Sequence, residues 1–450
     1  MSNMLNESHS RESFIYRRIV WRLIPFLVVC DILSVIDRLN IGFAKLQFMH
    51  DLSLDEAVVG MAAGVFYFGF LMFEIPSNLL LERYGIRKTI MRIMLLWGLA
   101  VMALAFAKTD FHLYALRFLL GAAEAGFLPG VMLYLTYWIP TRYSGRVTSL
   151  FLLAVPLAGV IAGPLSGWIL VEMSGVYGLH GWQWLFLLEG LPAILLGVAA
   201  HFVLVDRPQD AKWLTDKEKD VVATNLEVER AGEEGPSKTA LSAILRNPQV
   251  YALGIIYFFF YTILNALSTW PPSLLKAVGV NDIGEIGLRS GAISLAAIVG
   301  MVTIGFSSDR LGERRWHAVG CGLISGAAFI ALPLGAGNPN LTTLLFAIAS
   351  IGVYSFFSLF WTIPRTRLDR NAAAGGIALI SSLGALGGVF SPTFVGWMRV
   401  LTGSFYVALG ALGMAFCLTM ILLCYSTPRT TMLSAKSRFA AALDTTDVRK

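Results

Sequence analysis

The chain has 450 residues, of which 56% are hydrophobic and only 14% are charged, with a formal net charge of +6. Its mean hydropathy is +0.67. An average soluble domain is about 25% charged, so this composition excludes a soluble globular protein. A nucleic-acid partner would require one clustered basic face. Because the basic residues are instead spread among the segments between apolar runs, we expect no nucleic-acid partner.

Twelve segments are apolar enough, and long enough, to cross a bilayer, which takes about 20 mostly apolar residues. They predict an all-α membrane protein with twelve transmembrane helices. In chain order the predicted spans are 19–43, 58–81, 90–107, 113–139, 148–171, 184–205, 249–275, 290–306, 317–334, 341–364, 372–397 and 405–424.

The spans fall into two groups of six. The stretch between the groups holds the charged runs 216–220 and 233–236, which cannot reside in lipid. We therefore expect an N-terminal six-helix half at 1–205, a partly helical cytoplasmic linker at 206–247, a second six-helix half at 248–428 and a cytoplasmic tail at 429–450.

The basic residues predict the orientation, because loops rich in Lys and Arg stay on the cytoplasmic side. If the N-terminus is cytoplasmic, most of the 35 Lys and Arg residues fall on that side. Those expected on the other side are Lys45, Lys108, Lys276, Arg289 and Arg399. The sequence therefore predicts a multi-pass protein of the cytoplasmic (inner) membrane with both termini in the cytoplasm.

Two pairs of ionisable residues stand out inside predicted spans: Asp37 and Arg38 in the first, Arg117 and Glu124 in the fourth. An Arg or Asp at the centre of a span costs roughly 2.5 to 3.5 kcal/mol, and such residues normally face a bundle interior or a water-filled pathway. Arg117 and Glu124 are seven residues apart, so they share one helix face at a separation of about 10 Å. This pattern indicates a cavity that handles a charged solute.

Asp37 and Arg38 are neighbours that point roughly 100° apart, so at most one of them looks straight into that cavity. Asp37 could pair with Arg117, or Glu124 with Arg38. The plain alternative is a static internal charge network. Asp31, seven residues before Arg38, could be a third titrating group, a counter-ion to Arg38 or a solvated acid near the cytoplasmic vestibule.

These residue types suggest how a proton and an anion could be coupled. A buried carboxylate can gain or lose its proton as its surroundings change, whereas Arg stays charged and offers a planar fork that matches a carboxylate. A bound anionic substrate can then compete with the internal acid for the same Arg. Protonation of the acid would free that Arg for the substrate.

The second half has no clear mid-span charge but supplies aromatic and neutral polar groups. They are Tyr261, Asn265 and Trp270 in the seventh span, Trp361 in the tenth, and Ser381 and Ser382 in the eleventh. We expect Asn265, Trp361 and Ser381, together with Tyr67 of the second span, to contact the substrate. An aromatic residue in a span is also typical of packing or of the interfacial belt.

A short pattern repeats in the loops after the second and eighth spans, at 78–88 and 305–315, about half the chain apart. The two copies align acid on acid, basic on basic and glycine on glycine, as expected for two parallel six-helix halves. The residues concerned are Glu82, Arg83, Gly85 and Arg87 in the first copy, and Asp309, Arg310 and Gly312 in the second. Such an acid can meet a helix N-terminus or an Arg across the loop and lock one conformation, while the glycine permits a tight turn. The plain alternative is an ordinary positively charged cytoplasmic loop.

The repeated loop resembles the signature of the major facilitator superfamily, although Glu82 stands where Asp is usual and Asn78 where Gly is usual. Residues 37–44, 117–127, 206–214 and 373–378 are similar to the anion:cation symporters of that superfamily, in the branch of the tartrate, phthalate and hydroxyphenylacetate permeases. The resemblance implies proton-coupled uptake of an organic carboxylate. It implies Asp37 and Glu124 as protonation sites and the nearby arginines as substrate contacts.

The expected partners are therefore a small organic anion, protons and the lipid bilayer, and we expect a monomer. An exporter or antiporter of amphipathic or acidic compounds would share the fold. A membrane-embedded enzyme is disfavoured, because the sequence has no nucleophile with a nearby base. The four cysteines form none of the short Cys/His spacings that bind metal, so we expect no metal and no cofactor.

The eleventh span departs from the branch it resembles. Ser381 and Ala385 stand where an Asn is usual at each position. An amide offers two donors and an acceptor, whereas Ser offers one hydroxyl and Ala nothing. The sequence therefore predicts a less hydroxylated or bulkier carboxylate than a sugar acid, such as an aromatic acid.

Overall fold

The computed structural model describes residues 2–140, 143, 147, 151, 153–230, 246–361 and 370–426, without the side chains of 2–11, 82, 228–230 and 370–375. Within these ranges every regular element is a helix. The tail expected at 429–450, residues 231–245 of the expected linker and the side chain of Glu82 lie outside this description.

Where the structure describes them, the first six predicted spans are helical. They correspond to α1 (Ser2–Asp51), α2 (Glu56–Tyr84), α3 (Ile86–Leu104), α4 (Asp110–Glu124) with α5 (Phe127–Thr136), α7 (Ala154–Glu172) and α8 (Gly181–Val203). In the described part of the chain, 11 segments are long and apolar enough to cross a membrane. α3 is not among these 11 segments, and its first turns carry the basic residues Arg87, Lys88 and Arg92.

The described parts of the last six predicted spans are helical as well. They correspond to α11 (Pro248–Thr269) with α12 (Pro271–Ala277), α13 (Ile283–Leu311), α14 (Arg315–Ala331), α15 (Pro339–Phe360), α17 (Arg370–Thr402) and α18 (Phe405–Ser426). Short 3-10 turns lie at Val176–Gly178, Pro208–Asp210 and Leu332–Gly335. The prediction of twelve spanning helices is confirmed.

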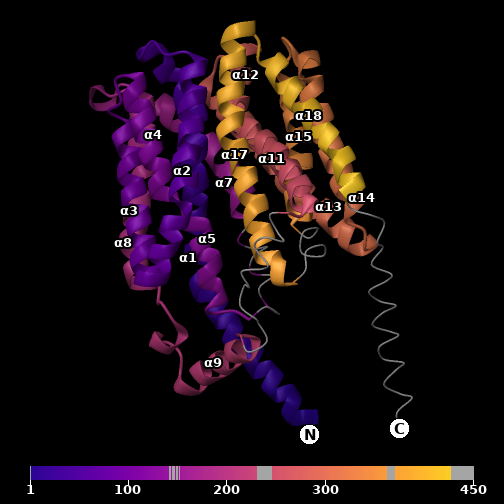
Figure 1. The fold of residues 1–450 in the computed structure, drawn as a ribbon. Coiled ribbons are helices and arrows are strands. Elements are labelled where there is room, and N and C mark those ends of the chain that lie inside the picture. Colours follow the sequence, from indigo (N-terminus) through magenta and orange to yellow (C-terminus); the bar gives the residue numbers. More distant parts are fainter. Residues whose placement is uncertain are drawn as a thin grey trace. The chain divides into compact units, whose positions relative to one another are not determined.

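The chain folds into two compact units. Unit 1 comprises Met1–Gly235, Ser268–Gly291 and Gly388–Gly403, and unit 2 comprises Pro236–Leu267, Ala292–Gly387 and Ser404–Lys450. In unit 1, α3 packs on α8, α2 on α4, and α1 on α7, α8 and α12 (Figure 1). In unit 2, α14 packs against both α15 and α18.

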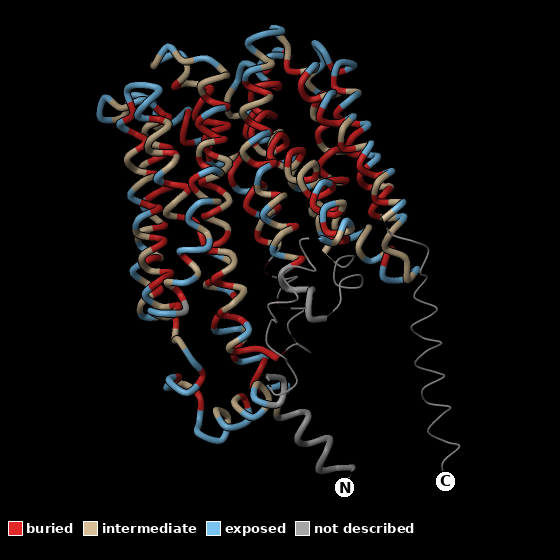
Figure 2. The backbone as a smooth tube through the Cα atoms, in the orientation of Figure 1, coloured by how far each residue is buried: buried red, intermediate tan, exposed pale blue. Residues whose placement is uncertain are grey.

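Large apolar side chains occupy both the interior and the outer faces of the helices. Trp97, Phe127 and Tyr134 are fully buried in unit 1, whereas Leu195 and Phe202 of α8 are exposed. Buried and exposed residues alternate along each helix (Figure 2). In water such exposed faces would be unfavourable, so their natural solvent is the hydrocarbon of a bilayer.

Two predicted spans are broken, each for a local reason. The fourth span stops at Glu124 and resumes as α5, because Gly126 adopts a left-handed conformation with φ 84°. A Cβ at Gly126 would lie 2.6 Å from the side chain of Ser77, so a larger residue does not fit there. The seventh span breaks at Trp270, where Pro271 and Pro272 open α12, because proline cannot continue the hydrogen-bond ladder.

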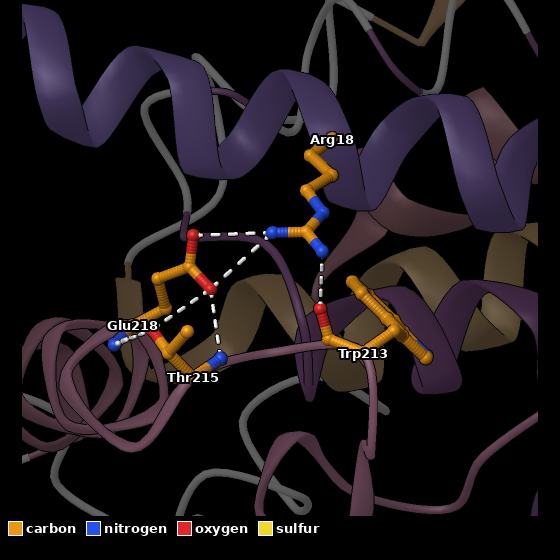
Figure 3. Close-up of polar contacts among 4 residues, drawn as sticks. All are labelled: Arg18, Trp213, Thr215 and Glu218. Carbon is orange, nitrogen blue, oxygen red and sulfur yellow. Dashed lines mark hydrogen bonds and ion pairs between the residues drawn. The ribbon is translucent and has the colours of Figure 1, made fainter.

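Part of the expected linker is helical and docks on α1. α9 (Asp216–Arg230) lies beside the early turns of α1 (Figure 1). Arg18 of α1 contacts Glu218 of α9 at 3.3 Å and donates to the carbonyl oxygen of Trp213 (Figure 3). Glu218 also accepts from the backbone N–H of Thr215 at 2.8 Å and so closes the first turn of α9. The linker thus has a fixed contact with the first span inside unit 1.

Candidate functional site

The four charged residues predicted from the first and fourth spans come together in the interior of unit 1. Asp37, Arg117 and Glu124 are 1%, 2% and 0% exposed, and the side chain of Arg38 is 21% exposed. α1 supplies one pair and α4 the other, with Glu124 at the last residue of α4 before the break. The expected clustering of Arg117 and Glu124 on the buried face of α4 is therefore present.

Glu124 forms an ion pair with Arg38. Nε of Arg38 donates to Oε1 of Glu124 at 2.8 Å, and the hydroxyl of Ser34 donates to the same oxygen. Oε2 of Glu124 has no hydrogen-bond partner among the described residues. Of the two pairings considered from sequence, this is the one that the structure contains.

Asp37 is held by neutral donors. The indole N–H of Trp97 donates to Oδ2, and the amide of Asn40 donates to Oδ1 at 3.4 Å. Arg117 lies close enough to Asp37 and Glu124 to interact with both electrostatically. Nothing in the described part of the chain, however, forms a hydrogen bond with Nε or Nη2 of Arg117.

Arg117 is thus a buried cation whose N–H groups are poorly satisfied. Its guanidinium carbon lies 5.9 Å from the centre of the Phe66 ring. Tyr67, the neighbouring residue on α2, is also within electrostatic range of it. A buried guanidinium that lacks acceptors is unfavourable unless an anion can supply them.

Asp31 is buried rather than solvated, with 5% exposure. It interacts electrostatically with Arg38 and Glu124, and its Oδ2 has no partner in the described part of the chain. The solvated alternative considered for Asp31 therefore does not hold in this structure. Its roles as a titrating group or as a counter-ion to Arg38 both stay open.

The other predicted contacts lie in unit 2. Asn265 is 3% exposed, and its amide donates to the carbonyl oxygen of Tyr261 at 2.8 Å. Trp361 meets the ring of Tyr257 edge-on at 4.9 Å. Ser381 is half-buried on α17. Trp361 therefore belongs to an aromatic cluster of unit 2, and its role as a substrate contact stays a prediction.

Sequence reasoning missed Glu189, which α8 places in the same interior as Asp37. Glu189 is 3% exposed and accepts a hydrogen bond of 3.1 Å from Ser166 of α7. It repels Asp37 electrostatically. The sequence could have indicated Glu189, because it is an acid inside the predicted span 184–205 and acids within a membrane are costly and normally functional.

Lys45 was expected in a loop, but α1 continues past it and the structure buries it at 1% exposure. Its ammonium lies 3.2 Å from Glu56 of α2 and 3.7 Å from the centre of the Trp270 ring. Lys276 of α12 donates to the carbonyl oxygen of Leu46 at 3.0 Å. Both contacts lie inside unit 1 and tie α1 to the segment around α12.

The first copy of the repeated loop packs against the start of the linker. Gly85 has φ 82°, and a Cβ there would lie 2.5 Å from the Asp206 carboxylate. Arg87 donates its backbone N–H to Asp206 at 3.0 Å and contacts the ring of His201 at 2.8 Å. Arg83 lies over the ring of Tyr84. The tight turn expected of the glycine is present.

The second copy makes its contact within the loop. Asp309 pairs with Arg314 at 3.1 Å, Gly312 has φ 63°, and Arg310 is exposed. The Asp309 contact is an Arg across the loop, one of the two partners considered from sequence.

Glu313 accepts from the backbone N–H groups of Trp316 and His317 at 2.7 and 3.2 Å, and so caps α14. Burial opposes the charged form of Glu313. These hydrogen bonds and the His317 ring outweigh that effect and lower the pKa of Glu313.

A comparison with known proteins decides the family. The model of the Major Facilitator Superfamily matches residues 27–392. The chain belongs to the major facilitator superfamily. Its relatives are transporters, and the chain is a transporter rather than an enzyme. In the described part of the chain, no group of three His, Cys, Asp or Glu side chains could hold a metal ion.

Three relatives match this chain over most of its length. A proposed metabolite transport protein NicT of Pseudomonas putida is 44% identical over 88% of this chain and 90% of its own. A proposed tartrate transporter of Agrobacterium vitis is 41% identical, over 91% and 92%. A quinolone resistance transporter of Acinetobacter baumannii is 36% identical, over 91% and 94%.

Among solved structures, the xylose transporter XylE of E. coli has a TM-score of 0.73 at 12% identity. The match covers 91% of this chain and 98% of that one. This likeness supports the twelve-helix fold alone.

Proposed function

We propose that this major facilitator superfamily transporter takes up an organic carboxylate anion by proton-coupled symport. The observation that carries the proposal is the buried guanidinium of Arg117, whose Nε and Nη2 have no hydrogen-bond partner in the described part of the chain. A carboxylate is the ligand whose geometry matches such a fork. Relatives named for tartrate transport support the same substrate class.

In the proposed cycle, Arg38 is held by Glu124 until Glu124 takes a proton. Protonation removes the negative partner of Arg38, so both Arg38 and Arg117 become available to the substrate carboxylate. Asp37 is the second proposed protonation site, because it lies within electrostatic range of Arg117. Tyr67, Asn265, Trp361 and Ser381 are proposed to shape the rest of the substrate site.

The loops after α2 and α13 are proposed to stabilise one conformation of the cycle. Arg87 and Gly85 against Asp206, and Asp309 against Arg314, are the contacts that would do so. We further propose a monomer in the inner membrane, with both termini cytoplasmic and two six-helix halves divided at 206–247. The basic residues of the cytoplasmic segments support this topology.

Uptake into proteoliposomes tests the proposal. The purified protein is reconstituted with an inward proton gradient, and accumulation of hydroxy-dicarboxylates, sugar acids and aromatic acids is measured. We expect at least one carboxylate to accumulate against its gradient, and a protonophore to abolish the accumulation. Carboxylate uptake that ignores the proton gradient would contradict the coupling, and failure of every carboxylate would contradict the substrate class.

Export is the second candidate, because one relative is a quinolone resistance transporter. Direction and substrate class separate the two functions. An exporter would extrude amphipathic compounds in exchange for protons, and counterflow of a small carboxylate would be absent. The paired Arg38 and unsatisfied Arg117 favour the carboxylate, since an amphipathic cation would be repelled by them.

A further inference from the structure

Glu189 is a buried acid for which the transport cycle above has no role. Oε1 accepts from Ser166, Oε2 has no partner, and no cation forms an ion pair with the carboxyl group anywhere in the described part of the chain. A buried carboxylate without a cation is strongly destabilised in its charged form. The surroundings of Glu189 therefore favour the neutral acid.

Asp37 is the acidic neighbour of Glu189, and Asn40 links the two. The amide of Asn40 donates to Asp37 at 3.4 Å, and the Asn40 side chain also interacts with Glu189. Asp37 and Glu189 repel each other when both are ionised. Two buried carboxyl groups that interact in this way release their protons as a coupled pair.

The two members of the pair have different surroundings. Asp37 receives the indole N–H of Trp97 and the amide of Asn40. It is attracted by Arg117 and repelled by Glu189 and Glu124. Glu189 receives the hydroxyl of Ser166 and interacts with the side chain of Asn40. Because Glu189, unlike Asp37, has no cation among these contacts, its neutral form is favoured.

No cation of the helices packed against α8 forms an ion pair with Glu189 in the described part of the chain. α1 brings Asp37, while its Arg38 pairs with Glu124, its Lys45 pairs with Glu56 and its Asp51 accepts from Trp182 near the start of α8. The charged side chains of α3 and α7 are Arg87, Lys88, Arg92 and Glu172. Arg87 contacts His201, twelve residues and about 18 Å along α8 from Glu189. Arg92 donates to Ser77 of α2, while Lys88 and Glu172 are exposed.

We propose that Glu189 is a proton-storing acid that is neutral in the substrate-free protein, and that it titrates together with Asp37 across Asn40. When a carboxylate binds Arg117, it weakens the attraction of Arg117 for Asp37, so the pair binds protons taken from water more tightly. The pair therefore holds its protons more firmly with substrate bound than without it. The coupling role rests on the proposed symport, whereas the protonation of Glu189 does not.

Infrared spectroscopy of the purified, substrate-free protein tests the protonation directly. At neutral pH we expect the wild type to show a protonated-carboxyl C=O band that is lost in Glu189→Gln. The matched control is Glu172→Gln, which changes an exposed acid of α7 and should leave the band intact. An unchanged band in Glu189→Gln would overturn the proposal.

Asp37→Asn tests the coupling without altering Glu189. This variant also tests the proposal if Glu189→Gln does not fold. Removing the Asp37 charge makes Glu189 easier to ionise, so the pH at which the band disappears should fall. An unchanged midpoint, or a band that persists at every pH in both proteins, would assign Glu189 a purely structural role. If no carboxylate is accumulated by the wild type, the symport fails, and the infrared result still decides the state of Glu189.

Discussion

The carboxylate of Glu124 pairs with Arg38 across α4 and α1, with 2.8 Å between Nε and Oε1. Arg117 lies on the same helix as Glu124 yet forms no ion pair with it among the described residues. The two arginines therefore differ in how readily a substrate carboxylate can bind them. A carboxylate must displace Glu124 to reach Arg38, whereas Nε and Nη2 of Arg117 already lack acceptors among the described residues.

This asymmetry predicts that Arg117→Lys weakens binding of the transported carboxylate by roughly tenfold or more, even though the charge is kept. A charge-assisted hydrogen bond is worth about 1.5 to 3 kcal/mol, and an ammonium lacks the planar fork. Arg38→Lys should weaken binding less, because Arg38 must first leave Glu124. Calorimetric titration measures both affinities. Wild-type affinity in Arg117→Lys would contradict the assignment.

Glu124→Gln and Asp37→Asn should abolish proton-driven accumulation while sparing some exchange of labelled for unlabelled substrate. Each variant mimics the protonated acid, so binding and reorientation remain possible without proton movement. Uphill uptake and counterflow in proteoliposomes separate the two activities. Full accumulation by both variants would exclude these residues as coupling sites.

Ser381→Asn should reduce transport of the native substrate. We expect that substrate to carry few hydroxyl groups, so an added amide leaves donors and an acceptor unpaired in the substrate site. A transport screen of wild type and variant against aromatic acids, tartrate and sugar acids measures the effect. Tight and selective binding of tartrate by the wild type would refute the expectation of a substrate with few hydroxyl groups. It would agree instead with the relatives named for tartrate transport.

The buried Lys45 predicts an unequal response to loss of either partner in its ion pair with Glu56. Glu56→Gln leaves a buried ammonium without its counter-charge and should cost roughly 1 to 3 kcal/mol of stability. Lys45→Met removes the charge itself, and should cost less because Glu56 remains partly exposed. Thermal unfolding in detergent measures both. Equal losses would show that the pair contributes through packing alone.

Glu313 predicts a pH dependence at the start of α14. Because the pKa of Glu313 is lowered in the folded protein, its capping stabilises the fold above the ordinary carboxyl pKa and is lost as pH falls through the lowered value. Glu313→Gln should speed hydrogen exchange at the Trp316 and His317 amides near neutral pH. The difference from wild type should shrink in acid. A difference that is independent of pH would argue against capping by the charged carboxylate.

The sequence by itself determined the spans and the residues that carry charge inside them. Asp37, Arg38, Arg117 and Glu124 stand out because an ion in an apolar segment is costly whatever the tertiary arrangement. The seven-residue spacing also placed Arg117 and Glu124 on one face, since that relation depends on helix geometry alone. The repeated loop indicated the family for a similar reason, because its turn chemistry is local.

The tertiary structure decided how those groups are paired. These helices are apolar almost all round, so periodicity does not say which face meets which neighbour. It could not show that Arg38 rather than Arg117 holds Glu124, or that Glu189 lies beside Asp37. It also could not show that Lys45 is buried against Trp270, far along the chain. Rotation of each helix about its axis, set by close packing, fixes these contacts.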